Sequence, residues 1–244
     1  MMWEKTFISG SRGYIGSNLY RLLCIDHDIE ECDLKIGRDI LSYEPIGKID
    51  CVYHIAGQAG AVPSLEDPIN DAKQNILGTI RAIQIANENK AKLIFSASAA
   101  AINPISPYGL SKKTAEDYIK LLCHNYVILR FSSVYGDKPV GVVDNFIREK
   151  YCTIFGDGSA VRDFVHVNDI AEALMKARNW EKGEYDCGSG KGTTILELAK
   201  ATGKDIKFLE KRDGEIHESI LKNTTPNWEP LIDVIEFIKD KCKK

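Results

Sequence analysis

The most informative segment of the chain is Phe7-Ile8-Ser9-Gly10-Ser11-Arg12-Gly13-Tyr14-Ile15-Gly16, in which an apolar run passes directly into a turn with three evenly spaced glycines. Glycine here permits a tight turn, a close approach of the backbone to a ligand, and close packing of a helix on a strand. A helix that begins at this turn offers free N–H groups and the positive end of its dipole to phosphate groups. The stretch therefore predicts a dinucleotide-binding turn, and the alternative is a glycine-rich turn that binds nothing.

Apolar strands alternate with helical patterns through the first half of the chain. We expect strands at 3–9, 29–32, 51–55, 92–96 and 127–130, and helices at 14–24, 71–89 and 108–124. Strands that alternate with helices of ten residues or more predict parallel pairing with right-handed crossovers. Runs that are apolar on consecutive residues fit strands covered on both faces. The predicted fold class is α/β, with a doubly wound parallel sheet of the Rossmann type.

The composition of the sequence changes after Gly136, where glycine and proline become frequent and the expected helices and strands become shorter. We expect helices at 168–178, 194–200 and 231–241 and a strand at 184–187. The predicted division is a dinucleotide-binding domain over residues 1–136 and a small lobe over residues 137–244. No flexible linker separates the two, so we expect them to be interleaved.

Composition excludes several classes of function. The chain of 244 residues has a net charge of -3, so a nucleic-acid partner is not expected. Its seven cysteines form no Cys-x-x-Cys pair, which predicts reduced thiols in a cytoplasmic protein rather than a disulfide framework or a metal site. No apolar run reaches the length of a membrane-spanning helix, so no membrane partner is expected.

Asp33 follows the expected second strand, 17 residues after Gly16. A carboxylate at this place accepts hydrogen bonds from the adenosine ribose hydroxyls and repels a 2′-phosphate, which favours NAD over NADP. NADP remains an alternative cofactor because of Arg12, Lys35 and Arg38, since a guanidinium near that ribose can bind the 2′-phosphate. The alternative for Asp33 is an ordinary turn aspartate.

Tyr108 and Lys112 are four residues apart and share one face of the expected helix. A free tyrosine with a pKa of about 10 is no base at neutral pH, but a nearby ammonium favours the phenolate. The alternative is a surface Tyr and Lys at a helix start; the strand just before favours the catalytic interpretation. Ser98 follows that strand and is preferred over Ser96 as the hydroxyl that shares the proton path.

His54 ends an apolar strand and is more simply a structural histidine than a base or metal ligand. The same interpretation is the simpler one for His166. No Ser/His/Asp order and no metal-ligand cluster stands out in the sequence. We therefore expect no metal.

Taken together, the chain resembles the extended short-chain dehydrogenase/reductases, in the nucleotide-sugar epimerase/dehydratase group of UDP-glucose 4-epimerase type. The resemblance covers nearly the whole length. It is carried by Gly10-x-x-Gly13-x-x-Gly16, His54-Ile55-Ala56-Gly57, Asn75-Ile76-Leu77-Gly78-Thr79, Ser98, Tyr108-x-x-x-Lys112, Leu129-Arg130-Phe131-Ser132-Ser133-Val134-Tyr135-Gly136, Phe155-Gly156-Asp157-Gly158-Ser159, Arg162-Asp163-Phe164-Val165-His166-Val167-Asn168-Asp169-Ile170 and Gly188-Ser189-Gly190.

The resemblance implies an NAD-dependent epimerase with a small C-terminal substrate-binding lobe that acts at C4 of a UDP-sugar through a transient 4-keto intermediate. Tyr108 would be the base, Lys112 its partner and Ser98 the group that orients the substrate hydroxyl. Together with the residues argued above, the expected cofactor contacts are Gly10, Arg12, Gly13, Tyr14, Ile15, Gly16, Asp33, Asp39, Ile40, Ala56, Gly57, Gln58, Asn75, Ser96, Tyr108 and Lys112. The expected substrate contacts are Ser98, Ser133, Phe155, Arg162 and Arg212. The helices 71–89 and 108–124 are expected to form a homodimer interface, as is common in this family.

Departures from the family pattern keep alternatives open. Dehydratases of the family carry an Asp-Glu pair where this chain has Ala99-Ala100, which argues for epimerisation. Arg12 resembles the loop of NADP-using reductases, so an NADP-dependent nucleotide-sugar reductase or dehydratase is the alternative enzyme. The short segment between Ser98 and Tyr108 motivates a third hypothesis, in which the chain is a non-catalytic NAD-binding regulatory protein.

Overall fold

The computed structural model describes residues 4–138, 141–211 and 217–243. The chain forms two compact units, of which the first comprises Met1–Arg130 and Ala171–Tyr185 and the second Phe131–Ile170 and Asp186–Lys244. The segment 171–185 thus belongs with the first unit, although it lies beyond residue 136. None of the described helices is both long and apolar enough to cross a membrane.

A six-stranded sheet in the order β2-β1-β3-β4-β5-β9 forms the centre of the first unit. Its strands are β1 (Lys5–Ser9), β2 (Asp28–Cys32), β3 (Cys51–His54), β4 (Lys92–Ser98), β5 (Tyr126–Phe131) and β9 (Gly183–Cys187). β1 pairs in parallel with both β2 and β3, and β3 pairs in parallel with β4. The predicted Rossmann-type α/β fold is therefore confirmed.

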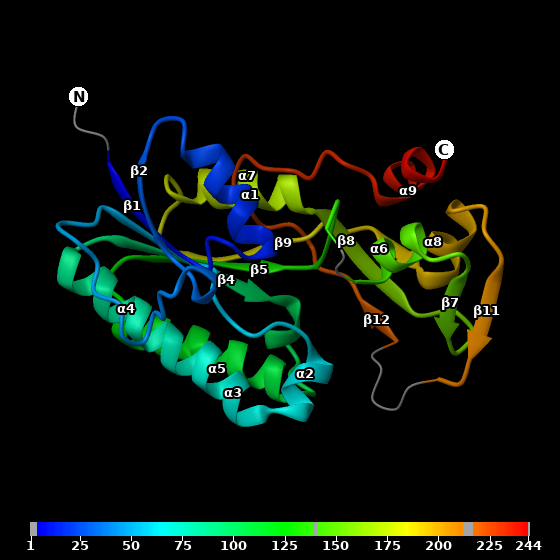
Figure 1. Cartoon of the computed structure of the whole chain (residues 1–244), viewed down its shortest axis with the longest axis horizontal. Helices are drawn as coiled ribbons and strands as arrows, with labels where there is room; N and C mark the ends of the chain where they lie inside the picture. The colour runs from blue at the N-terminus through cyan, green and yellow to red at the C-terminus, as the bar shows by residue number, and fades with distance from the viewer. Residues whose placement is uncertain (1–3, 139–140, 212–216, 244) are drawn as a thin grey trace. The chain divides into compact units, whose positions relative to one another are not determined.

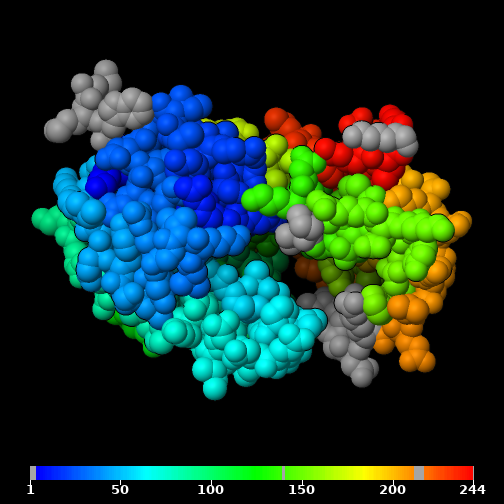
Figure 2. Space-filling model, viewed as in Figure 1, coloured from blue at the N-terminus to red at the C-terminus, as the bar shows by residue number. Residues whose placement is uncertain are grey.

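Helices cover both faces of this sheet (Figure 1). They are α1 (Tyr14–Leu23), α2 (Ala61–Glu66), α3 (Pro68–Ala72), α4 (Gly78–Asn89), α5 (Pro107–Leu122) and α7 (Val167–Ala177), with short turns η1 (Leu34–Ile36), η2 (Lys73–Leu77) and η3 (Ala99–Ala101). α4 and α5 lie on one face, and α1 and α7 lie on the other (Figure 1). The short helices α2 and α3, drawn in cyan, form part of the molecular surface (Figure 2).

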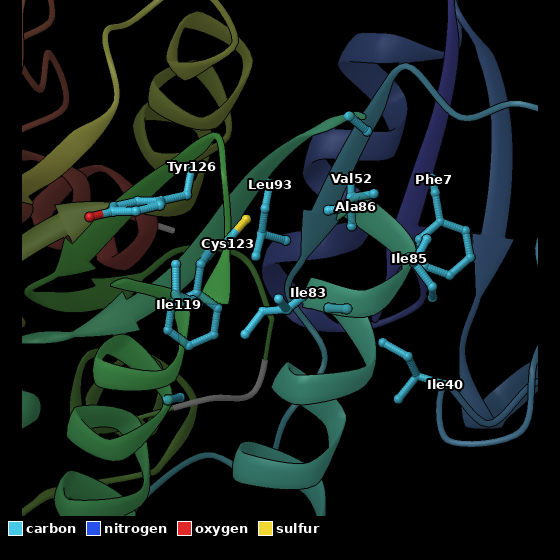
Figure 3. Close-up of a cluster of buried hydrophobic side chains, with 14 of the residues drawn as sticks. Phe7, Ile40, Val52, Ile83, Ile85, Ala86, Leu93, Ile119, Cys123 and Tyr126 are labelled. Atoms are coloured by element: carbon cyan, nitrogen blue, oxygen red, sulfur yellow. The ribbon is translucent and has the colours of Figure 1, made fainter. Parts of the chain in front are cut away.

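Apolar side chains from the sheet and from α4 and α5 form the core of the first unit (Figure 3). Phe7, Val52 and Leu93 come from three neighbouring strands and are fully buried. Ile83 and Ile119 pack on them from α4 and α5. Burial of each such side chain contributes about 1.5–3 kcal/mol, which fixes both helices on the sheet.

The strand order reverses direction at β1, because β2 lies on one side of it and β3 on the other. In open α/β sheets, ligands bind at such a switch point, beyond the carboxyl ends of the strands. The turn that follows Ser9 and the segment that follows His54 both begin at this edge. The topology therefore places the predicted cofactor turn where the fold offers a ligand crevice.

The second unit contains shorter elements. A sheet in the order β10-β8-β12, with β6 also paired to β8, is accompanied by a parallel pair of β11 and β7. These elements are β6 (Ser133–Tyr135), β7 (Cys152–Phe155), β8 (Val161–His166), β10 (Gly192–Thr194), β11 (Ile206–Leu209), β12 (Glu218–Ser219), α6 (Gly141–Arg148), α8 (Ile195–Ala201) and α9 (Val234–Cys242). Thr194 and Glu197 form a capping box that fixes the start of α8.

The expected helix over 71–89 is divided into three consecutive pieces. α3 ends at Ala72, the π-helical η2 follows, and α4 continues to Asn89. Such π-helical turns occur mostly as local insertions in α-helices and are frequent at functional sites. Asn75 lies inside this turn and is buried.

Candidate functional site

The glycine turn after β1 leaves no room for larger residues. Gly10 has a φ of +76°, and a Cβ atom there would lie 2.6 Å from the backbone nitrogen of Ala56. A Cβ atom on Gly16 would overlap the carbonyl oxygen of Gly10. Gly13 is the N-cap of α1 and provides no side-chain cap, and the start of such a helix is a common binding place for phosphate groups.

Buried polar atoms with unused hydrogen-bonding capacity lie in and beside this turn. Among the described residues, Ser11 Oγ, Gln58 Oε1 and Asn75 Oδ1 are buried without a hydrogen-bond partner. Buried polar groups are nearly always hydrogen-bonded in native proteins. A ligand rich in hydroxyl and phosphate groups, such as a dinucleotide, fits this set. Tyr14 and Ile15 form the half-buried first turn of α1.

Asp33 is held at the rim of the turn by two backbone hydrogen bonds. Its Oδ2 accepts from the backbone N–H of Arg12 at 2.9 Å, and its Oδ1 accepts from that of Lys35 at 2.8 Å. The guanidinium of Arg12 is paired with Glu31 at 2.5 Å. A carboxylate at this place, with the neighbouring arginine already paired, favours ribose hydroxyls over a 2′-phosphate.

Asp39 and Ile40 follow β2 at the same end of the sheet. Asp39 Oδ1 accepts a hydrogen bond of 3.0 Å from the backbone N–H of Leu41, which closes a local turn. Ile40 is buried, and its side chain packs in the core cluster of the first unit (Figure 3). The expected contact of this pair with the adenine stays a prediction.

Tyr108 lies in the first turn of α5. Ser106 caps this helix by accepting from the backbone N–H of Gly109 at 3.2 Å, and Pro107 occupies the first helical position. The backbone N–H of Tyr108 donates to Ser64 Oγ at 3.0 Å. The Tyr108 side chain is hydrogen-bonded to that of Ser98. The structure thus brings Tyr108 together with Ser98, the serine that the sequence favours over Ser96.

The pKa of Tyr108 is raised above its ordinary value. Burial is the largest cause, the hydrogen bond with Ser98 opposes it, and the charge of Asp71 adds to it. The Lys112 ammonium donates a hydrogen bond to the carbonyl oxygen of Ser96. Lowering the pKa of this phenol therefore requires a further positive charge.

Lys112 is buried beside the cofactor turn, where its Nζ donates to the carbonyl oxygen of Ser96 at 3.0 Å. Burial lowers the pKa of Lys112 to about 8, although Asp71 and Glu116 oppose this fall. A Cβ atom on Gly57 would overlap Asn75 Oδ1 and lie 3.4 Å from Lys112 Nζ. The two polar atoms therefore lie against the same point of the backbone.

Sequence reasoning missed the partners of Asn75. Its Nδ2 donates to Asp71 Oδ1 at 2.8 Å, to the carbonyl oxygen of Gln58 at 3.1 Å and to Ser111 Oγ at 3.1 Å. Ser111 Oγ in turn donates to the carbonyl oxygen of Tyr108 at 3.0 Å. The four-residue spacing of Asp71 and Asn75 on one helix face was the available signal.

The expected substrate residues of the second unit line one cavity. Ser133, Phe155 and Arg162 surround a volume of about 660 Å³, which is the size of a small-molecule site. Arg162 donates through its Nη1 to the carbonyl oxygens of Val161 at 2.8 Å and of His217 at 3.2 Å. Arg212 lies outside the described residues.

His54 is a structural residue, as the sequence indicates. It is fully buried, its Nδ1 lies 2.6 Å from Ser9 Oγ, and its Nε2 lies 3.2 Å from Thr79 Oγ1. Burial lowers its pKa to about 3, so the ring is neutral at physiological pH. Within the described part of the chain, no three His, Cys, Asp or Glu residues are placed to hold a metal ion.

A family model described as the NAD dependent epimerase/dehydratase family matches residues 6–188. A protein of Methanocaldococcus jannaschii named "Putative UDP-glucose 4-epimerase" is 30% identical to the chain, with 95% of each covered. A UDP-glucose 4-epimerase of Mycolicibacterium smegmatis is 27% identical, with 96% of each covered.

Solved structures resemble the chain over its whole length. A UDP-glucose 4-epimerase of Thermotoga maritima, solved with UDP-glucose, is 26% identical with a TM-score of 0.86 and 98% of each chain covered. A UDP-N-acetylglucosamine 4-epimerase of Methanobrevibacter ruminantium has a TM-score of 0.88 at 24% identity, covering 100% of this chain and 98% of that one, and this likeness concerns the fold.

Proposed function

The chain belongs to the NAD dependent epimerase/dehydratase family, and from this premise we propose that it is an NAD-dependent epimerase that inverts C4 of a UDP-sugar through a transient 4-keto intermediate. The observation that carries the proposal is the Tyr108 side chain, hydrogen-bonded to Ser98 and one helical turn from the buried Lys112. Relatives of similar length that carry the name UDP-glucose 4-epimerase support C4 as the reacting position.

The residues at the glycine turn fit NAD. Gly10, Gly13 and Gly16 would hold the pyrophosphate at the start of α1, and Asp33 would hold the adenosine ribose. The unpartnered Asn75 Oδ1 would receive a hydroxyl near Lys112. When bound, NAD supplies the acceptor and donor of a hydride and a positive charge on its nicotinamide ring.

Tyr108 would move the proton of the reaction. Its phenolate would accept the proton of the sugar 4-hydroxyl and return it to the same oxygen after inversion. Ser98 would hold that oxygen through its hydroxyl. Lys112, fixed by Ser96, would keep a positive charge beside the phenolate and stabilise it.

The cavity of the second unit would bind the nucleotide. Arg162 would contact the diphosphate, for which a planar guanidinium is suited, and Phe155 would pack on the base. Ser133 would donate or accept a further hydrogen bond. Arg212 is proposed as a second phosphate contact on the resemblance alone.

The chain lacks the acid–base pair of a dehydratase. Ala99 and Ala100 form the turn η3 directly after Ser98, and the backbone N–H of Ala100 donates to Ser98 Oγ at 3.2 Å. Neither side chain can donate or accept a proton. This supports epimerisation over loss of water from the sugar.

We also propose a cytoplasmic homodimer that associates through residues 71–89 and 108–124. Leu77, Leu110, Leu121 and Leu122 of these segments are exposed. Exposed apolar side chains on neighbouring helices support an interface with a second copy. All seven cysteines are free thiols, as expected in a reducing compartment. Sedimentation of only monomer at micromolar concentration would contradict the dimer.

The test of the proposed activity is incubation of the purified protein with UDP-galactose or UDP-glucose, with and without added NAD. Interconversion of the two sugars with no net consumption of NAD is the expected result. Turnover that occurs only when NADPH is supplied would assign the chain to the reductases instead.

A further inference from the structure

Asp71 is a buried carboxylate that the mechanism above does not use. It lies in α3 and is only 1% exposed. Its Oδ1 accepts the Nδ2 proton of Asn75 at 2.8 Å. Since a buried charge is costly unless it serves an interaction, a carboxylate at this place calls for an explanation.

The carboxylate fixes the orientation of the Asn75 amide. Asn75 Nδ2 donates to three acceptors, which are Asp71 Oδ1, the carbonyl oxygen of Gln58 and Ser111 Oγ. A rotation of the amide by half a turn would place Asn75 Oδ1 against these acceptors, so the observed orientation is favoured. Asn75 Oδ1 is thereby held against Gly57, on the side where Lys112 Nζ lies.

We propose that Asp71 is a positioning residue for proton transfer, which holds the Asn75 amide in place and supplies a fixed negative charge facing Tyr108 and Lys112. The inference rests on the proposed function, because it concerns the proton path of that same site. Asp71 acts through Asn75, Tyr108 and Lys112, and no contact between Asp71 and the substrate is required.

The charge of Asp71 acts on both partners in the same direction. It raises the pKa of Lys112, against burial, and it raises the pKa of Tyr108. The other charged or titratable groups here are Glu116 on α5, which pairs with Arg130 at 2.6 Å, and His54 at the end of β3. His54 is neutral at physiological pH, and Glu116, which pairs with Arg130, also raises the pKa of Lys112. Asp71 differs from Glu116 because its charge raises the pKa of both Lys112 and Tyr108.

The test is the pH profile of kcat/KM for Asp71→Asn, which keeps the shape and an acceptor for Asn75 but removes the charge. The profile is measured on enzyme loaded with NAD, whose positive ring lowers the pKa of Tyr108. The rising limb, which reports Tyr108, and the falling limb, which reports Lys112, are both expected to move to lower pH by about one unit. The matched control is Asp117→Asn, because Asp117 is an exposed carboxylate of α5 that pairs with Lys113. Its profile is expected to match that of the wild type.

A rate that falls equally at every pH, with both limbs in place, would overturn the inference, because it would indicate a structural role alone. An unchanged profile would overturn it as well. If circular dichroism shows that Asp71→Asn does not fold, Asp71→Ser keeps a hydroxyl acceptor without the charge and is expected to give the same shift. Wild-type protein that folds and binds NAD but epimerises no sugar would contradict the proposed function instead.

Discussion

Lys112 Nζ donates a hydrogen bond of 3.0 Å to the carbonyl oxygen of Ser96, the residue two positions before Ser98 on β4. The same ammonium lies 4.9 Å from the ring centre of Phe95. This hydrogen bond ties α5 to the end of β4, so the lysine, the tyrosine and the serine are held by one helix and one strand. Groups placed on rigid elements keep the geometry that proton transfer requires.

The activity is expected to fall as the pH rises through about 8. Burial lowers the pKa of Lys112 to about 8, so the ammonium that stabilises the Tyr108 phenolate is lost above that pH. The measurement is kcat/KM between pH 6 and pH 10. Lys112→Arg, which stays charged in this range, is expected to lose the falling limb near pH 8. A falling limb that persists in this variant would show that another group causes it.

Glu31→Gln is expected to weaken the preference for NAD over NADP. The carboxylate of Glu31 pairs with Arg12 at 2.5 Å, and its removal frees a guanidinium beside Asp33 to accept a 2′-phosphate. The ratio of the two dissociation constants, measured by calorimetry, should change about fivefold, equivalent to about 1 kcal/mol. Glu44→Gln, which breaks the ion pair of Glu44 with Arg81, is the control. The same ratio in wild type and Glu31→Gln would contradict this role.

Arg162→Ala is expected to weaken UDP binding about tenfold or more, because a charge-assisted hydrogen bond contributes about 1.5–3 kcal/mol. Arg162 lines the cavity of the second unit together with Phe155. The dissociation constant of UDP and the KM of the UDP-sugar should rise together. Lys222→Ala removes an exposed cation of the same unit and should leave both unchanged. Unaltered UDP affinity in Arg162→Ala would remove the cavity from the proposed substrate site.

His54 is expected to reduce stability as the pH falls below 6.5. Its pKa is about 3 in the folded protein, against an ordinary value of 6.5, so between these values only the unfolded chain binds the proton. The free energy of unfolding should therefore fall by about 1.4 kcal/mol per pH unit in this window, with no such contribution above 6.5. Denaturant unfolding at pH 7 and pH 5 measures this loss.

The loss should be smaller in His54→Gln than in the wild type. His124→Gln, a change of an exposed histidine, should leave the loss as it is. An equal pH dependence in wild type and His54→Gln would contradict the assignment.

The sequence predicts the first unit well because its signals are local. The glycine turn requires small residues at Gly10 and Gly16, and the structure shows the backbone contacts that impose this requirement. Consecutive apolar residues likewise predict β1, β3 and β4, which are covered on both faces. The family membership follows from the order of such motifs along the chain.

Other features could not be predicted because they depend on contacts distant in the sequence. The pKa of Tyr108 depends on its burial and on the charge of Asp71, neither of which the four-residue spacing to Lys112 reveals. The pairing of Arg12 with Glu31 joins two elements 19 positions apart. The short strands of the second unit, such as β12 with two residues, carry too few residues for a periodic signal.

Tyr108 is the proposed base, and its role is measured by comparing Tyr108→Phe with the wild type, both loaded with NAD. The change removes one hydroxyl and keeps the ring and the backbone hydrogen bond to Ser64. We expect kcat for interconversion of UDP-glucose and UDP-galactose to fall by about 10²–10⁴, measured with enough NAD to keep both proteins saturated. A Tyr108→Phe protein that epimerises at the wild-type rate would contradict this role.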